Sequence, residues 1–245
     1  MMKNGVKHEK MLVETFHMRE LQTWYSNKAH KLMKRAIPEI VDMERANGLT
    51  GEANPKTDII LSGANDSSRP GYRAVRATLS VKMPGDVMLS SAGGKGTANI
   101  LQKVYRSSKG KAPRANTLPY LLESKVPQKL EEEKYAEWKA DEGDSVIAQL
   151  HNWLDKHDLW IPFIVEMLSG KEQFRGNNLA FASHLFCAGY PDNAGDGYCV
   201  PITNKLAKSM LKHIKVRLFK KGSAWRGVRR PSIAIDLRRN WCPSA

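Results

Sequence analysis

The 245-residue sequence has few cysteines, and their spacing excludes several classes of protein. It contains three of them, Cys187, Cys199 and Cys242, and an odd number cannot form a closed disulfide framework. A structural zinc site built from His184 and these cysteines is an alternative, but no C-x-x-C pair supports it. We therefore expect buried thiols in a reducing compartment and no secreted, disulfide-stabilised scaffold.

Long hydrophobic runs are also missing. The longest apolar stretch, residues 159–168, contains Pro162 and Glu166 and is about half the length needed to span a bilayer. The first ten residues carry several lysines and lack the apolar segment of a signal peptide. We expect no membrane association, and an intracellular protein or one packaged inside a particle that assembles in the cell.

Acidic residues are scarce relative to basic ones, with 25 Asp and Glu against 39 Lys and Arg, for a net charge of +14. The acids concentrate in residues 121–172, and the segments on either side are strongly basic. Such an excess favours a polyanionic partner, because each phosphate contact releases counterions. The charge pattern predicts a nucleic-acid surface formed by both ends of the chain. A cationic protein adapted to packing in an acidic particle is the alternative.

The hydrophobic pattern predicts mixed α and β structure along the whole chain. Helices are expected at residues 9–47, broken before Pro38, and at 97–107, 118–139, 143–169, 179–186 and 204–212. Strands are expected at residues 59–61, 72–83, 87–90, 199–202, 214–220 and 232–237. The last two strands form a terminal β-hairpin in this interpretation.

Asp58 and Lys82 carry the main chemical signal. Asp58 precedes an apolar strand and follows residues 55–57 (P-K-T), and Lys82 ends the next long strand two residues after Ser80. Because side chains alternate along a strand, Ser80 and Lys82 point to the same face. A carboxylate beside a lysine can hold a hydrated metal ion against a phosphate. Alternatively, Asp58 caps a turn and Lys82 is a solvated strand end.

The order of helix, P-x-x-D entering a strand, a strand ending in S-V-K, and a glycine-rich turn before a helix resembles the PD-(D/E)xK nuclease superfamily. The resemblance covers roughly residues 10–107. It implies a restriction-endonuclease-like fold, with Asp58 binding the metal and Lys82 stabilising the attacking water and the phosphate charge. More loosely, the later segments resemble uncharacterised phage proteins of this type, which implies a phage-encoded member.

Ser80 departs from the family pattern, since an acid is expected at that position. A serine has no charge with which to bind a metal, so the second carboxylate must come from elsewhere. The resemblance implies a glutamate of the first helix. Glu20, Glu39 and Glu44 are candidates, and Glu20 is preferred because it lies in the amphipathic part of the expected helix. Ser80 would then orient a ligand or water.

The glycine loop at residues 93–97 (G-G-K-G-T) is a second candidate site. It fails as a P-loop, because Leu89 occupies the position of the required glycine. Lys95 and the backbone amides at a helix N-terminus can still bind a DNA phosphate, and a plain strand-to-helix turn is the alternative. Further DNA contacts are expected from the basic terminal hairpin, at Lys215, Arg217, Lys220, Lys221, Arg226, Arg229 and Arg230.

Three segments are expected: residues 1–115 as the nuclease-like core, 116–172 as an acidic helical subdomain, and 173–245 as a basic segment packing on the core. The fold class is α/β (α+β), a small mixed sheet flanked by helices with a helical insertion and a C-terminal hairpin. The basic segment contributes the terminal hairpin.

The expected function is a DNA endonuclease that uses Mg²⁺ or Mn²⁺. The alternative is a catalytically inactive nuclease-fold protein that binds DNA or forms part of a virion. Partners would be DNA, a second copy in a homodimer, and phage-particle proteins, with no membrane. The location would be the cytoplasm of an infected host cell, or the virion.

Overall fold

The computed structural model describes residues 4–18, 24–52, 55–65, 73–82, 88–187, 197–221 and 228–237. The chain forms two compact units, and it passes between them several times. The first unit comprises Met1–Asp86, Leu168–Leu206 and Cys242–Ala245, and the second comprises Val87–Met167 and Ala207–Trp241. Each sheet belongs to one unit, so the two units are described separately.

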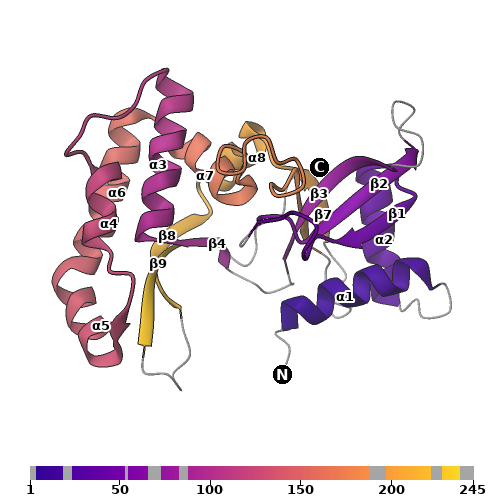
Figure 1. Ribbon diagram of the computed structural model, residues 1–245, viewed down its shortest axis with the longest axis horizontal. Coiled ribbons are helices and arrows are strands. Elements are labelled where there is room, and N and C mark those ends of the chain that lie inside the picture. Colours follow the sequence, from indigo (N-terminus) through magenta and orange to yellow (C-terminus); the bar gives the residue numbers. More distant parts are fainter. Residues whose placement is uncertain are drawn as a thin grey trace. The chain divides into compact units, whose positions relative to one another are not determined.

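A five-stranded mixed sheet forms the centre of the first unit (Figure 1). Its strands, in spatial order, are β1 (Asp42–Arg45), β2 (Ile59–Asn65), β3 (Arg73–Lys82), β6 (His184–Cys187) and β7 (Tyr198–Pro201). The β3–β6 pair is parallel and the other pairs are antiparallel. A long excursion of the chain, including residues 87–167 of the second unit, separates β3 from β6, which permits the parallel pairing.

Helices α1 (Asn4–His17) and α2 (Trp24–Ala36) pack against this sheet. Leu12 of α1 and Met33 of α2 share one buried cluster with Leu79 of β3. The alternate residues of β3, Thr78 and Ser80, are also buried, at 2% and 5% exposure. Both faces of β3 are therefore covered, as expected for a strand with a parallel neighbour.

The second unit combines helices with a separate four-stranded sheet. Its helices are α3 (Gly94–Lys109), α4 (Leu118–Lys125), α5 (Glu132–Trp138) and α6 (Asp144–His157), with a π-helical turn at Lys139–Gly143. Helices α7 (Trp160–Ser169) and α8 (Asn204–Met210) each cross a boundary between the units. In the sheet, β9 (Val228–Leu237) pairs with β4 (Met88–Gly93), β5 (Leu130–Glu131) and β8 (Ile214–Lys221).

The expected fold class is confirmed: the protein is a mixed α/β structure with a mixed sheet flanked by helices. The strands β8 and β9 form the expected antiparallel pair near the C-terminus. The expected division at residues 115 and 172 stays a prediction. It follows the distribution of charge, whereas the two compact units are defined by packing. Among the described residues, no helix is long and apolar enough to cross a membrane.

One expected helix is wrong in part and another is wrong throughout. The helix expected at 9–47 ends at Ala36 before Pro38, and residues 42–45 form the edge strand β1 instead. The helix expected at 179–186 is absent: residues 179–183 form turns and bends, and residues 184–186 belong to β6. In both places the segment pairs with a neighbouring strand, and these backbone hydrogen bonds outweigh a weak local preference for helix.

Packing on β3 leads to a first prediction. Replacing Leu79, which is fully buried, with alanine should lower the free energy of unfolding by roughly 2–5 kcal/mol, through lost burial and a cavity. Val75→Ala is the matched control on the same strand, since Val75 is 45% exposed and should cost less than about 1 kcal/mol. Urea unfolding of the two variants checks this, and equal losses would contradict the packing described here.

Candidate active site

Asp58 and Lys82 lie at one end of the five-stranded sheet. Asp58 directly precedes β2 and Lys82 is the last residue of β3. Because β2 and β3 are antiparallel and Ile59 pairs with Leu79, the start of one strand meets the end of the other. The backbone of Asp58 is held on both sides: its N–H donates to the Leu79 carbonyl at 2.8 Å, and its carbonyl accepts from the Ala46 N–H at 3.0 Å.

The carboxylate of Asp58 takes part in the hydrogen bonding of the sheet. Its Oδ2 accepts the backbone N–H of Val81 at 2.7 Å, and the Ser80 side chain also hydrogen-bonds to it. Burial raises the pKa of Asp58 above its ordinary value, while Lys82, the Val81 N–H, Lys56 and Ser80 act in the opposite direction. A partly buried carboxylate surrounded by cations and donors is typical of a functional site.

A second carboxylate, Glu9 of α1, lies close enough to Asp58 and Lys82 for their charges to interact. Burial and the negative charge of Asp58 raise the pKa of Glu9, while Arg45 and Lys82 lower it. Nη2 of Arg45 donates to Oε2 of Glu9 at 3.3 Å and fixes this side chain relative to the end of β1. Since Asp58 and Lys82 both act electrostatically on Glu9, the three groups share one local environment.

Glu9 was not among the acids expected from the sequence. Glu20 lies outside the described residues. Glu39 is exposed and pairs with Arg76 at 3.4 Å, and Glu44 is exposed on β1. The sequence does contain one signal for Glu9: it stands three and seven residues before Leu12 and Phe16, so it lies on the apolar face of the first helix.

The segment that precedes β6 is hydrogen-bonded to the turn that contains Asp58 and to β3. The Lys56 N–H donates to the Ala180 carbonyl at 2.8 Å. The hydroxyls of Thr57 and Thr78 both donate to the Phe181 carbonyl, at 2.8 and 2.7 Å. These bonds join residues more than one hundred positions apart, so they position the Asp58 turn relative to β3 through contacts that local sequence does not reveal.

Two carboxylates and a lysine suit a particular kind of metal. Mg²⁺ is usually held by one or two carboxylates, completed by water and by substrate phosphate oxygens. Glu9 and Asp58 provide hard oxygen ligands of this kind. In the part of the chain that the structure describes, no group of three or more His, Cys, Asp or Glu residues could hold a metal ion. Two carboxylates would leave the other positions around such an ion to water and substrate oxygens.

The two described cysteines lie on neighbouring strands and are half-buried, which is less than the sequence led us to expect. Cys199 of β7 pairs with Phe186 of β6, next to Cys187. Burial raises the pKa of Cys199 to about 12, so its thiol is protonated at neutral pH. Cys242 lies outside the described residues.

The basic residues expected to contact DNA fall into two groups in the second unit. Lys95 lies in the first turn of α3 and lines a surface pocket with Lys129, Lys221 and Arg230. Nζ of Lys95 also lies 4.0 Å from Oε1 of Glu123. This pocket gathers cations around a helix N-terminus, which is the arrangement expected for the glycine loop.

The basic residues of the second group form ion pairs with carboxylates of the protein itself. Arg217 pairs with Asp236, and Lys220 and Arg229 both pair with Glu132. Lys215 is exposed on β8, and Arg226 lies outside the described residues. The sequence pattern could not separate these groups, because Glu132 is almost one hundred residues away from Arg229.

The comparisons with known proteins concern the fold. No family model matches the chain, and no curated protein matches it. Its structure is similar to the crystal structure of the restriction endonuclease MspI in complex with its cognate DNA, with a TM-score of 0.54 and 12% sequence identity. The similarity covers 94% of this chain and 87% of the other. At this identity the comparison shows that the two proteins share a restriction-endonuclease-like fold.

The burial of Asp58 predicts an unusual effect on stability. A raised pKa means that ionisation destabilises the folded state, so this group's contribution to stability falls as the pH rises from its ordinary pKa of 3.8 through the folded-state pKa. Asp58→Asn should therefore raise the free energy of unfolding at pH 7, without added metal, by on the order of 1 kcal/mol.

Urea unfolding from pH 4 to pH 8 measures this effect, and the difference between variant and native protein should grow with pH. Glu14→Gln is the control, because Glu14 lies on the same helix as Glu9 and is 50% exposed in an ion pair with Lys10. A loss of stability in Asp58→Asn at pH 7 would contradict the expected sign.

Proposed function

We propose that this protein is a DNA endonuclease of the PD-(D/E)xK type that hydrolyses phosphodiester bonds with Mg²⁺ or Mn²⁺. The observation that carries the proposal is the meeting of Glu9, Asp58 and Lys82 at one end of the mixed sheet. The fold shared with a restriction endonuclease that was solved with its cognate DNA supports DNA as the substrate. So does the net charge of +14.

Each residue has a role that follows from its chemistry. Asp58 and Glu9 would hold the metal ion, which when bound supplies positive charge at the phosphate oxygens. Lys82 orients the attacking water and offsets the negative charge that develops on the phosphate. Ser80 holds the Asp58 carboxylate through its hydrogen bond, and Arg45 holds Glu9. Both are positioning residues in this proposal.

Glu9 offers an answer to the problem posed by Ser80. The family pattern expects an acid at this strand position, and the serine leaves the site with one carboxylate on the two strands. Glu9 approaches from α1 and brings the count to two, within the range that Mg²⁺ uses in proteins. The proposed ligand set is therefore Asp58 and Glu9, with Ser80 as a hydrogen-bonding neighbour.

A second candidate function is a DNA-binding or virion structural protein that retains the nuclease fold without activity. Ser80 in place of an acid is the observation that favours it. Phage origin, action in the cytoplasm of an infected host or in the virion, and association as a homodimer or with phage-particle proteins belong to the proposal. They rest on the sequence resemblance. The two functions share DNA as partner and differ in whether the DNA is cut.

A plasmid-nicking assay with Mg²⁺ and with Mn²⁺ separates the two functions. We expect the native protein to nick supercoiled DNA, and Asp58→Ala, Lys82→Ala and Glu9→Gln each to lower the rate by roughly 100-fold or more, because each removes a charge from the site. Glu14→Gln should keep the native rate.

Two results would decide against the proposal. Nicking that survives both Asp58→Ala and Lys82→Ala would exclude this site. A native protein that binds DNA but does not cut it with either metal would favour the non-catalytic function. Circular dichroism of each variant shows whether a lost activity reflects a lost fold.

Metal binding should also depend on pH. Burial raises the pKa of both Asp58 and Glu9, so a metal ion competes with protons for them and should bind more tightly as the pH rises through the folded-state values. Titration calorimetry with Mn²⁺ should show this trend for the native protein and a loss of binding in Asp58→Asn. Affinity independent of pH would argue against these two carboxylates as the ligands.

A further inference from the structure

A surface pocket of the second unit has a lining of unusual composition. Its volume is about 390 Å³. It lies between the end of α3, the loop that follows, and α6. The lining residues are Tyr105, Lys111, Pro113, Arg114, Thr117, Trp153, Lys156 and His157. All of them belong to the second unit, and no acidic residue is among them.

Three aromatic rings meet in this pocket. The Tyr105 and Trp153 rings have centroids 5.7 Å apart, and the His157 ring lies 5.2 Å from Tyr105 and 5.0 Å from Trp153. Trp153 is only 8% exposed. Its indole N–H is buried and has no hydrogen-bond partner within the described part of the chain. A buried donor without an acceptor costs free energy.

The rim of the pocket is positively charged. Lys111, Arg114 and Lys156 are exposed, and none of them forms an ion pair with a described residue. For Lys111 and Arg114 the sequence contributes to this, because residues 87–122 contain six Lys and Arg and no Asp or Glu. Burial lowers the pKa of His157, and the charges of Lys156 and Lys109 lower it further, which shows the local excess of positive charge.

The nearest acid along α6 does not neutralise this rim. Asp155 accepts the indole N–H of Trp160 at 2.6 Å through its Oδ1, so it is engaged outside the pocket. Thr117 donates its hydroxyl to the Arg114 carbonyl at 2.7 Å, which ties the loop that carries Arg114. The side chains offered to a ligand are therefore mainly donors and cations.

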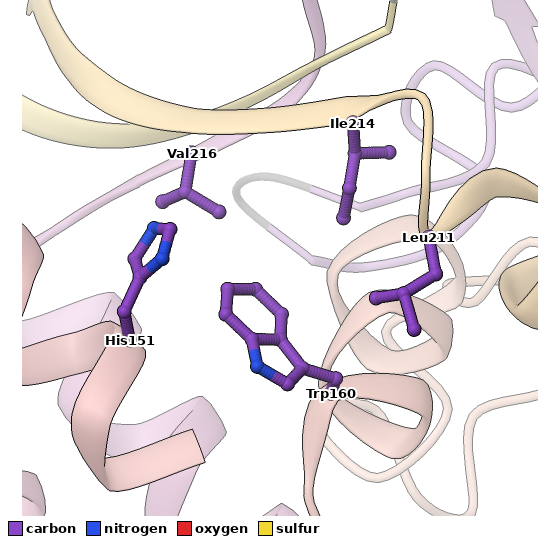
Figure 2. Close-up of a pocket in the computed structure, with 5 residues that line it drawn as sticks. All are labelled: His151, Trp160, Leu211, Ile214 and Val216. Atoms are coloured by element: carbon purple, nitrogen blue, oxygen red, sulfur yellow. The ribbon is translucent and has the colours of Figure 1, made fainter. Parts of the chain in front are cut away.

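A neighbouring pocket shows the contrast. It is smaller, about 160 Å³, and is lined by His151, Trp160, Leu211, Ile214 and Val216 (Figure 2). Its walls are apolar apart from His151 and the Trp160 indole, and it carries no lysine or arginine. Both pockets contain aromatic rings, but the first is larger and, of the two, it alone is lined by lysine and arginine.

We propose that the pocket formed by Tyr105, Trp153 and His157, with its rim of Lys111, Arg114 and Lys156, binds a phosphate group of a nucleic acid. Lysine and arginine supply charge-assisted hydrogen bonds to phosphate oxygens. The aromatic rings suit the sugar or base attached to that phosphate. The site is separate from Glu9, Asp58 and Lys82, so it does not depend on cleavage. The phosphate belongs either to the continuous backbone or to a 5′ end.

Fluorescence anisotropy with a 3′-labelled ten-nucleotide oligothymidylate tests this proposal, with EDTA present so that cleavage plays no part. The variant Arg114→Ala/Lys156→Ala should weaken binding at least tenfold. The matched control is Lys208→Ala/Lys212→Ala, which removes two exposed lysines of the same unit and should change affinity less than twofold at the same salt concentration.

The source of the phosphate follows from two further probes. A loss of affinity when the 5′-phosphate is absent from the oligonucleotide assigns the pocket to a chain end, and unchanged affinity assigns it to the backbone. Competition by inorganic phosphate is expected in either case. Equal losses in both double variants would show unspecific charge attraction and overturn the proposal. Tighter binding of a polyglutamate peptide, unaffected by phosphate, would also overturn it.

The same measurements keep this proposal distinct from the nuclease site. Glu14→Gln should bind the oligothymidylate as the native protein does in EDTA, since Glu14 lies on α1 of the first unit and outside both sites. If the native protein does not nick plasmid DNA but Arg114→Ala/Lys156→Ala weakens oligonucleotide binding, the phosphate pocket is supported and the proposed nuclease activity is not. If the native protein nicks plasmid DNA but the double variant binds the oligonucleotide normally, the nuclease activity is supported and the phosphate pocket is not.

Discussion

The hydrogen bond from the Val81 N–H to the Asp58 carboxylate is the contact on which the first unit's site depends. It places a negative charge inside the sheet, at the point where β2 begins and β3 ends. Burial makes this charge unfavourable, and Lys82, Lys56 and Ser80 offset part of that cost. We expect a neutral side chain of the same shape to be more stable there, so the carboxylate fits the functional role proposed for Asp58.

The core of the first unit fixes the helices and strands that meet at that end of the sheet. The core under β3 is apolar, and the Leu12 and Met33 side chains fix the helices α1 and α2 on it. Because α1 is fixed, Glu9 reaches the site, and Arg45 at the end of β1 keeps it there. The parallel strand β6 brings Ala180 and Phe181 against the Asp58 turn. The contacts that pack the first unit therefore also position Glu9 and Asp58.

Local sequence was informative where the chemistry is local. The alternation along residues 78–82 and the P-x-x-D turn predicted two strands with Asp58 and Lys82 at adjoining ends, and both strands are present. The same approach was wrong for residues 42–45 and 184–187, which form strands only because β2 and β3 offer partners. It also could not recognise that Glu132 neutralises Lys220 and Arg229, since nothing in the spacing links these residues.

Composition and strand periodicity were enough to indicate an α/β protein with a basic surface and to place Ser80 and Lys82 on one face. Those properties depend on charge totals and on neighbours one or two residues away. The proximity of Glu9 to Asp58 depends on how α1 packs on the sheet. The gathering of Tyr105, Trp153 and His157 beside a basic rim depends on the packing of helices α3 and α6. Contacts between distant segments follow from the packing of the whole chain, and local patterns do not contain that information.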